Sequence, residues 1–202
     1  MIVKIFASPV DYTLDTLYRK EKNEYLIGVE KGAVHALEHG LELDLAVGDF
    51  DSVTESEKAF IRKHAKAVDT HKVHKDKSDS DLAITRALEK NPARIVMYGG
   101  VGSRLDHTYG NILFLKRGNI TIMTDKVKMF ILKPGTYGIT HNHDYISFFA
   151  VEDVAELTLE GFLFPLDGYD LKVDDPLCIS NQGQGVVSFK SGKLLVIQAD
   201  DE

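Results

Sequence analysis

The sequence is short of cysteine and of long apolar runs. Cys178 is the single cysteine among 202 residues, so an internal disulfide is excluded and a reducing, cytoplasmic location is expected. No stretch approaches the roughly 18 apolar residues that would span a bilayer. The first residues also lack the apolar segment and cleavage site of a signal peptide. We therefore expect a cytoplasmic protein without a membrane partner.

Positive charge is also scarce. The chain has 24 Lys and Arg against 31 Asp and Glu, a formal net charge of -7. This balance argues against nucleic acid as a partner, because phosphate backbones attract clustered basic residues. It does not exclude a small anionic ligand that binds together with a metal ion. The histidines show no zinc-ligand spacing, and no Ser-His-Asp set, dinucleotide fingerprint or Gly-x-x-x-x-Gly-Lys motif occurs.

The first 125 residues alternate between strand and helix patterns. Apolar runs predict strands at 1–7, 25–29, 43–47, 68–73, 95–98 and 120–123. Helical periodicity predicts helices at 12–21, 33–39, 54–66, 82–90 and 106–116. Such alternation is typical of an α/β domain with a mostly parallel sheet and helices on both faces.

The pattern changes after residue 125, where helical periodicity stops. Short alternating runs predict strands at 128–132, 136–139, 145–151, 156–159, 177–180, 186–189 and 194–198. Ser191-Gly192 reads as a hairpin turn between the last two, and the aromatic residues Phe148, Phe149, Phe162 and Phe164 read as core. Many short strands in succession indicate an antiparallel sandwich. We expect two domains, residues 1–125 (α/β) and 126–202 (all-β).

One stretch combines acidic groups with a strand end. Asp49 and Asp51 follow the strand at 43–47, and Gly48 permits a sharp turn or a close approach to a ligand. Carboxylates at this spacing suit Mg²⁺, which proteins hold by one or two carboxylates together with substrate phosphates. The alternative is a solvated turn in which Asp51 or Ser52 caps the following helix.

Two further polar stretches follow later strands. Residues 75–81 hold three aspartates before a helix, but Ser78 with Asp81 also has the spacing of a capping pair. Residues 99–107 are rich in glycine; backbone N–H groups there suit phosphate, and Arg104 can neutralise it. The alternative for this stretch is an ordinary turn with Asp106 as helix cap. Because all three stretches follow strands of one parallel sheet, we expect them at one edge as an anion-plus-metal site.

The order of these motifs resembles the thiamine pyrophosphokinase (thiamine diphosphokinase) family. The matching segments are Gly48-Asp49-Phe50-Asp51-Ser52, Lys75-Asp76-x-Ser78-Asp79, Gly99-Gly100-x-Gly102-x-Arg104-x-Asp106-His107 with Asn111, Gly161-Phe162-x-Phe164-Pro165-Leu166, and Ile179-Ser180-Asn181. The resemblance covers nearly the whole chain. It implies an α/β nucleotide- and metal-binding domain, a thiamine-binding β-sandwich, and a homodimer with active sites between subunits.

The resemblance also implies an activity and its residues. The activity is Mg²⁺-dependent transfer of a pyrophosphoryl group from ATP to the thiamine hydroxyl, with release of AMP. Mg²⁺ would be held by Asp49, Asp51 and Asp79, and the catalytic set would add Arg104 and Asp106. ATP would contact Lys75, Asp76, Ser78, Gly100, Arg104 and Asn111, and thiamine would contact Asp106, His107, Ser180 and Asn181.

One departure from the family pattern lies after the second strand. Glu30-Lys31-Gly32 stands where the family usually has Asp followed by Gly-Gly or Lys-Gly. The role of Glu30 is therefore open at this point. Two other classes also fit paired aspartates after a strand: a Mg²⁺-dependent phosphohydrolase, and a non-catalytic nucleotide-sensing module.

Overall fold

The structure, a computed structural model, describes residues 1–70 and 77–201. The chain divides into two compact units, Met1–Asp125 and the residues from Lys126 onward. Each unit is described below by itself.

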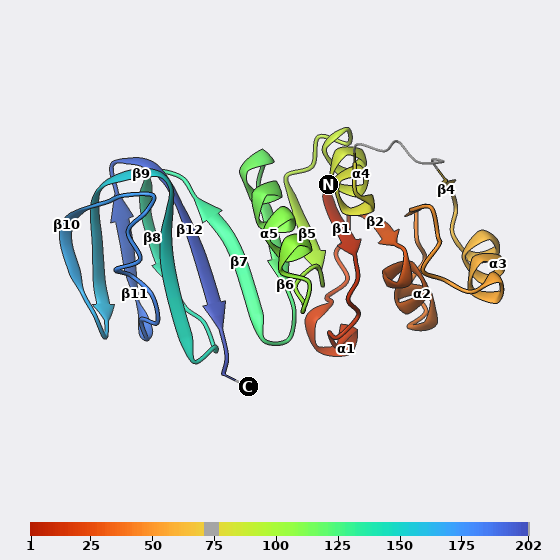
Figure 1. The fold of residues 1–202 in the computed structure, drawn as a ribbon, viewed down its shortest axis with the longest axis horizontal. Helices are drawn as coiled ribbons and strands as arrows, with labels where there is room; N and C mark the ends of the chain where they lie inside the picture. The colour runs from red at the N-terminus through yellow and green to blue at the C-terminus, as the bar shows by residue number, and fades with distance from the viewer. Residues whose placement is uncertain (71–76, 202) are drawn as a thin grey trace. The chain divides into compact units, whose positions relative to one another are not determined.

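The first unit is built on a parallel sheet. Its strands are β1 (Ile2–Phe6), β2 (Glu24–Val29), β3 (Leu45–Val47), β4 (Val68–Asp69), β5 (Arg94–Tyr98) and β6 (Ile120–Met123). They lie in the order β4-β3-β2-β1-β5-β6, and every pairing between them is parallel (Figure 1). The predicted α/β architecture is thus confirmed.

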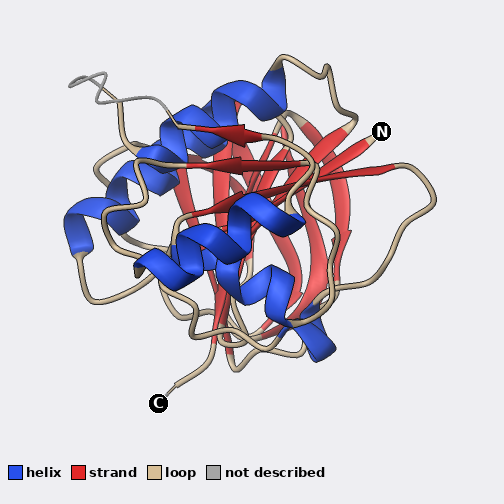
Figure 2. Ribbon diagram, turned by 90° about the vertical axis from the view of Figure 1, so that its right-hand side faces the viewer, coloured by secondary structure: helices blue, strands red, loops and turns tan. Residues whose placement is uncertain are grey.

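Helices cover both sides of this sheet (Figure 2). They are α1 (Leu14–Leu17), α2 (Lys31–Glu38), α3 (Glu55–His64), α4 (Asp79–Leu88) and α5 (Leu105–Phe114), and the 3₁₀ turn η1 (Leu115–Arg117) continues α5. In the part of the chain that the structure describes, no helix is long and apolar enough to cross a bilayer.

The helix predicted over residues 12–21 is wrong in length. Only the four residues Leu14–Leu17 are helical. Tyr18 follows in an extended conformation, with φ -77° and ψ 133°, and its hydroxyl donates a 2.5 Å hydrogen bond to Glu24 Oε1. The chain therefore leaves the helix at Tyr18, whose side chain contacts the start of β2.

Every strand pairing found among the described residues of the second unit is antiparallel. Its strands are β7 (Val127–Leu132), β8 (Gly135–Ile139), β9 (Tyr145–Phe162), β10 (Leu166–Leu171), β11 (Gly183–Phe189) and β12 (Ser191–Ala199). They lie in the order β7-β12-β9-β11-β8, and β10 pairs with β9. The predicted antiparallel, strand-rich second half is confirmed.

Strand β9 accounts for most of the errors in this unit. It runs for 18 residues where two separate strands were predicted, and it bends at Glu156, whose φ is 55°. β12 pairs with its first part and β11 with its last part. Ser191 and Gly192 therefore lie inside β12 and form no hairpin, because β11 and β12 both pair with β9.

Two further predictions in this unit are wrong, the strand at 177–180 and the place of Phe164 in the core, and one strand was missed. Residues 177–180 form turns, and the missed strand is β10. The core contains Phe148 and Phe162, whose rings meet edge-to-face with centroids 5.5 Å apart. Phe164 does not belong to it, because 59% of its surface is exposed.

Candidate active site

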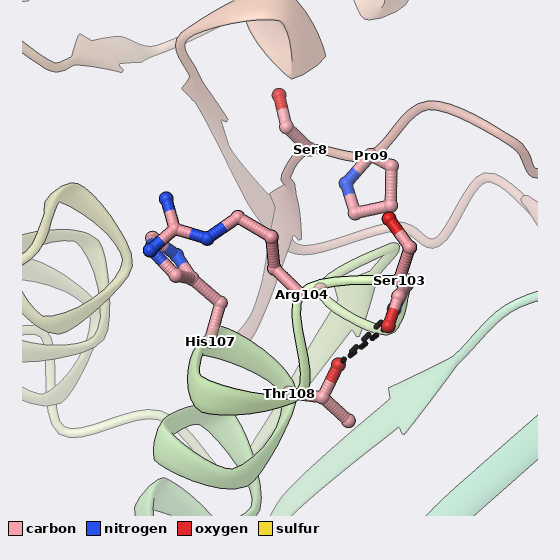
Figure 3. Close-up of a pocket in the computed structure, with 8 residues that line it drawn as sticks. Ser8, Pro9, Ser103, Arg104, His107 and Thr108 are labelled. Carbon is pink, nitrogen blue, oxygen red and sulfur yellow. Dashed lines mark hydrogen bonds between the residues drawn. The ribbon is translucent and has the colours of Figure 1, made fainter.

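The topology of the parallel sheet marks one position for ligand binding. The chain builds β1 to β4 outward in one direction and then returns to add β5 and β6 on the other side of β1. Ligands of open α/β sheets bind beyond the carboxyl ends of the strands at such a reversal. A pocket of about 240 Å³ lies there (Figure 3), lined by Ser8 and Pro9 after β1 and by Gly100, Gly102, Ser103, Arg104, His107 and Thr108 after β5.

The glycine-rich turn that forms one wall of the pocket is hydrogen-bonded to side chains of α5. Gly100 has a φ of +76°, and its carbonyl accepts a 2.7 Å hydrogen bond from Asn111 Nδ2. Gly102 N donates to Thr108 Oγ1 at 3.1 Å (Figure 3). Asn111 is buried, and its side chain contacts the turn through this hydrogen bond.

Arg104, which lines this pocket, forms an ion pair with Asp106. Arg104 Nη2 lies 2.6 Å from Asp106 Oδ2, and Arg104 Nε lies 3.3 Å from Oδ1. Hydrogen bonding to the guanidinium lowers the pKa of Asp106, and both side chains are largely exposed. The N-cap of α5 is Arg104, without a side-chain cap bond, so the alternative with Asp106 as helix cap is wrong.

A group of carboxylates lies at the same edge of the sheet. Glu30, at the end of β2, joins Asp49 and Asp51, just after β3, with one oxygen from each within 4.8 Å of the others. We call these three residues the carboxylate cluster. Thr54 caps α3, so the alternative in which Asp51 or Ser52 caps that helix is excluded.

Asp79 lies in the first turn of α4 and interacts with the cluster. Ser78 caps this helix by accepting a 3.2 Å hydrogen bond from Asp81 N, so the capping interpretation of Ser78 is confirmed. Burial, followed by the negative charges of the carboxylate cluster, raises the pKa of Asp79 to about 6. Among the described residues, no lysine or arginine forms an ion pair with Asp79 or with the cluster.

The donor set fits a hard divalent cation. It consists of carboxylate oxygens, which Mg²⁺ and Ca²⁺ prefer. Two oxygens on opposite sides of one Mg²⁺ would be about 4.2 Å apart, twice the usual bond length, and the cluster oxygens lie within 4.8 Å. Burial, followed by repulsion from the cluster, raises the pKa of Asp79, and a cation would relieve the repulsion. Sequence reasoning flagged Glu30 as a departure from the family but missed it as a member of the cluster.

The β-unit has a smaller pocket of its own, of about 180 Å³. It is lined by Leu159, Phe164, Leu166, Leu177, Cys178, Ile179 and Asn181. Asn181 is 2% exposed, and its amide brackets Phe164: Oδ1 accepts from Phe164 N at 2.9 Å, and Nδ2 donates to Phe164 O at 2.7 Å. Ser180 is exposed, with its N–H bonded to Ser147 Oγ at 3.0 Å.

The structure brings several predicted site residues of the α/β unit to one strand edge. Asp49 and Asp51 belong to the carboxylate cluster, Asp79 interacts with it, and Gly100, Arg104 and His107 line the larger pocket. Lys75 and Asp76 lie outside the described residues.

Comparison with known proteins identifies the family. Residues 17–128 match the model described as the catalytic domain of thiamin pyrophosphokinase. Residues 136–195 match the model of its vitamin B1 binding domain. The chain belongs to the thiamine pyrophosphokinase family.

Individual members of this family are similar over the whole chain. A curated thiamine pyrophosphokinase from Bacillus subtilis (strain 168) is 43% identical over 98% of this chain and 97% of its own length. A crystal structure of thiamine pyrophosphokinase from Bacillus subtilis superposes with a TM-score of 0.88 at 36% identity, covering 100% of this chain and 99% of the other. The enzyme from Geobacillus thermodenitrificans gives 0.86 at 30% identity with the same coverage. Membership in the thiamine pyrophosphokinase family makes the chain an enzyme, a thiamine diphosphokinase.

Proposed function

We propose that the chain transfers the terminal pyrophosphoryl group of ATP to the hydroxyl of thiamine, yielding thiamine diphosphate and AMP. Family membership supports pyrophosphoryl transfer that forms thiamine diphosphate. The observation that supports the nucleotide and metal is the arrangement at one strand edge: a pocket at the sheet reversal, together with the carboxylate cluster and Asp79.

The α/β unit supplies the groups that a magnesium–polyphosphate ligand requires. The carboxylate oxygens of Asp49, Asp51 and Asp79 would hold Mg²⁺, which when bound would neutralise charge on the phosphate oxygens. Residues of the glycine-rich turn line the pocket at the start of α5, where backbone donors and the helix dipole favour an anion. Lys75, Asp76, Ser78 and Asn111 stay predicted nucleotide-site residues.

Arg104 is suited to a bidentate interaction with phosphate. Its guanidinium already shows this mode in its pairing with Asp106. We propose that Arg104 exchanges Asp106 for phosphate oxygens when the nucleotide binds, which leaves Asp106, with His107, to face thiamine. The thiamine hydroxyl then attacks the β-phosphorus and loses its proton to solvent, the bond from that phosphorus to the α,β-bridging oxygen breaks, and AMP leaves. Fixed donors at these oxygens would stabilise the charge that develops there.

The β-unit is proposed to bind thiamine. Its pocket is mainly apolar and holds an aromatic residue, Phe164, at its edge, which suits a heteroaromatic, cationic ligand. Ser180 and Asn181 are the predicted polar residues of this region. From the family resemblance we also propose a cytoplasmic homodimer in which the β-unit of one subunit serves the α/β unit of the other.

The products of one reaction test the proposal. Incubation of the protein with ATP, Mg²⁺ and thiamine, followed by chromatography, should give AMP and thiamine diphosphate in equal amounts. ADP with thiamine monophosphate would refute attack at the β-phosphorus. Phosphate release without a thiamine product would indicate a phosphohydrolase, and nucleotide binding without turnover would indicate a sensing module.

A further inference from the structure

Glu30 occupies an unusual position in the carboxylate cluster. It is 7% exposed, whereas Asp49 and Asp51 are exposed. Its backbone has φ 51° and ψ -127°, a combination that residues other than glycine rarely adopt. A conformation of this kind persists only when the surroundings determine it.

Both carboxylate oxygens of Glu30 are bound to the turn that carries the aspartates. Oε1 accepts a 2.7 Å hydrogen bond from Phe50 N, and Oε2 accepts a 2.6 Å hydrogen bond from Ser52 Oγ. Phe50 stands between Asp49 and Asp51 in the chain. The carboxylate of Glu30 therefore fixes the backbone at the midpoint between the two exposed carboxylates.

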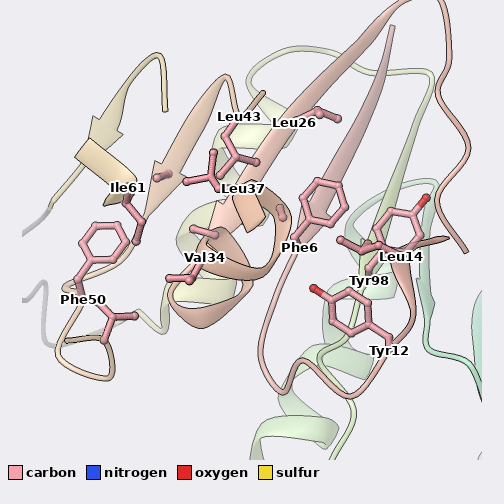
Figure 4. Packing of buried hydrophobic residues seen from close by; sticks show 14 of the residues in the cluster. Phe6, Tyr12, Leu14, Leu26, Val34, Leu37, Leu43, Phe50, Ile61 and Tyr98 are labelled. Atoms are coloured by element: carbon pink, nitrogen blue, oxygen red, sulfur yellow. The ribbon is translucent and has the colours of Figure 1, made fainter. Parts of the chain in front are cut away.

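The turn is shaped to receive this carboxylate. A Cβ atom at Gly48, where φ is +148°, would overlap Glu30 Oε1. From the other side, the ring of Phe50, whose φ is 56°, is buried in the core near Ile61 (Figure 4). The backbone of Phe50 is thus held between its own buried ring and Glu30. Asp51 N in turn donates to Asp49 Oδ1 at 3.0 Å, which couples the two aspartates.

We propose that Glu30 is a positioning residue, which acts through Phe50 and Ser52 to aim Asp49 and Asp51 at a bound divalent cation and is not itself a ligand. This inference rests on the proposed function of the strand edge. Its basis in this chain is the length of the glutamate side chain, which lets the carboxylate reach both Phe50 N and Ser52 Oγ.

Two conservative substitutions separate positioning from ligation. Glu30→Gln keeps the length of the side chain and an oxygen that accepts from Phe50 N. Its amide N–H can donate to Ser52 Oγ, because a hydroxyl oxygen also accepts hydrogen bonds. Glu30→Asp keeps the charge but shortens the reach. Positioning predicts that Asp is the more damaging change, whereas direct ligation predicts that Gln is.

The test is the binding of Mn²⁺, measured by electron paramagnetic resonance in the presence of α,β-methylene-ATP, which cannot be cleaved at the α,β bridge. We expect the dissociation constant of Glu30→Gln to stay within about threefold of the parent value and that of Glu30→Asp to rise at least about tenfold. Ser52→Ala, which removes one of the two hydrogen bonds, should give an intermediate rise. Glu42→Gln, an exposed site in the loop before β3, is the control for loss of one negative charge.

Each other outcome has a definite meaning. Equal or greater loss in Glu30→Gln than in Glu30→Asp would overturn positioning in favour of ligation, and parental affinity in all variants would overturn any role for Glu30. If Glu30→Asp does not fold, parental affinity in Ser52→Ala would overturn the proposal. Failure of the parent protein to bind Mn²⁺ would instead contradict the proposed metal site.

Discussion

At the scale of single residues, the Asp79 carboxyl carries the clearest pH dependence of the site. Its pKa is raised from 3.8 to about 6, so its ionisation opposes folding when no cation is bound. This destabilisation is absent below about pH 4, develops as pH rises through 6, and is complete above it. A neutral side chain at this position would avoid it.

We therefore expect Asp79→Asn to raise the melting temperature in the absence of divalent cations. The gain should be largest at pH 7.5 and should disappear near pH 4, as measured by calorimetry in EDTA. Asp174→Asn, an exposed position in the β-unit, is the control and should show no such trend. A gain that is independent of pH would contradict the raised pKa of Asp79.

The position of a site residue could be predicted from the sequence where the residue directly follows a predicted strand. Asp49 and Asp51 follow a strand directly, so their place at the strand edge follows from the rule for parallel sheets. The role of Glu30 was not predictable, because it depends on a contact between the ends of β2 and β3 that hydrophobic patterns do not encode. The ion pair of Arg104 with Asp106 was missed for a different reason, because the sequence analysis assigned both side chains to ligands.

At the scale of elements, a capping box in the first turn stabilises α3. Thr54 Oγ1 accepts from Glu57 N at 3.3 Å, and Glu57 Oε2 accepts from Thr54 N at 2.6 Å. Lys31 Nζ lies 2.8 Å from the same carboxylate. This contact, followed by the hydrogen bonds that Thr54 donates to the carboxylate, lowers the pKa of Glu57 to about 2. The helix start therefore links α3 to α2.

Thr54→Ala should lower the free energy of unfolding by about 1 kcal/mol, the usual cost of losing an N-cap side chain. Urea unfolding followed by circular dichroism would measure it, with Thr140→Ala, at an exposed loop threonine, as the matched control. An equal effect in both variants would show that the capping box contributes nothing specific.

Elements were predicted best where a single local pattern determines them. Helical periodicity over 54–66 gave α3, and apolar runs gave the parallel strands, although residues 71–73 of the strand predicted at 68–73 lie outside the described residues. The β-unit was harder, because a long strand shared by two sets of partners looks like two short strands in a sequence. Residues 166–171 were missed because only Leu171 among them is buried, so the period-two pattern is weak.

At the scale of the whole molecule, the proposed shared active site has a direct test. Asp51→Asn removes a proposed metal ligand of the α/β unit, and Asn181→Ala removes the hydrogen bonds to the backbone of Phe164 in the β-unit. Each variant alone should have an activity that is lower by orders of magnitude. Subunits mixed and allowed to exchange should recover about a quarter of the parent activity, because half of the dimers would be mixed, each with one intact site of two. No recovery after proven exchange would show that each chain forms its own site.

The order of strands in the β-unit has a consequence for synthesis on the ribosome. β12 follows the other strands of the unit in sequence, yet it lies between β7 and β9. Until β12 leaves the exit tunnel, β7 and the first half of β9 have unpaired edges, which are prone to aggregate. All six strands of the parallel sheet have emerged long before. We therefore expect the α/β unit of the nascent chain to fold first. The β-unit should depend on chaperones until β12 has been synthesised.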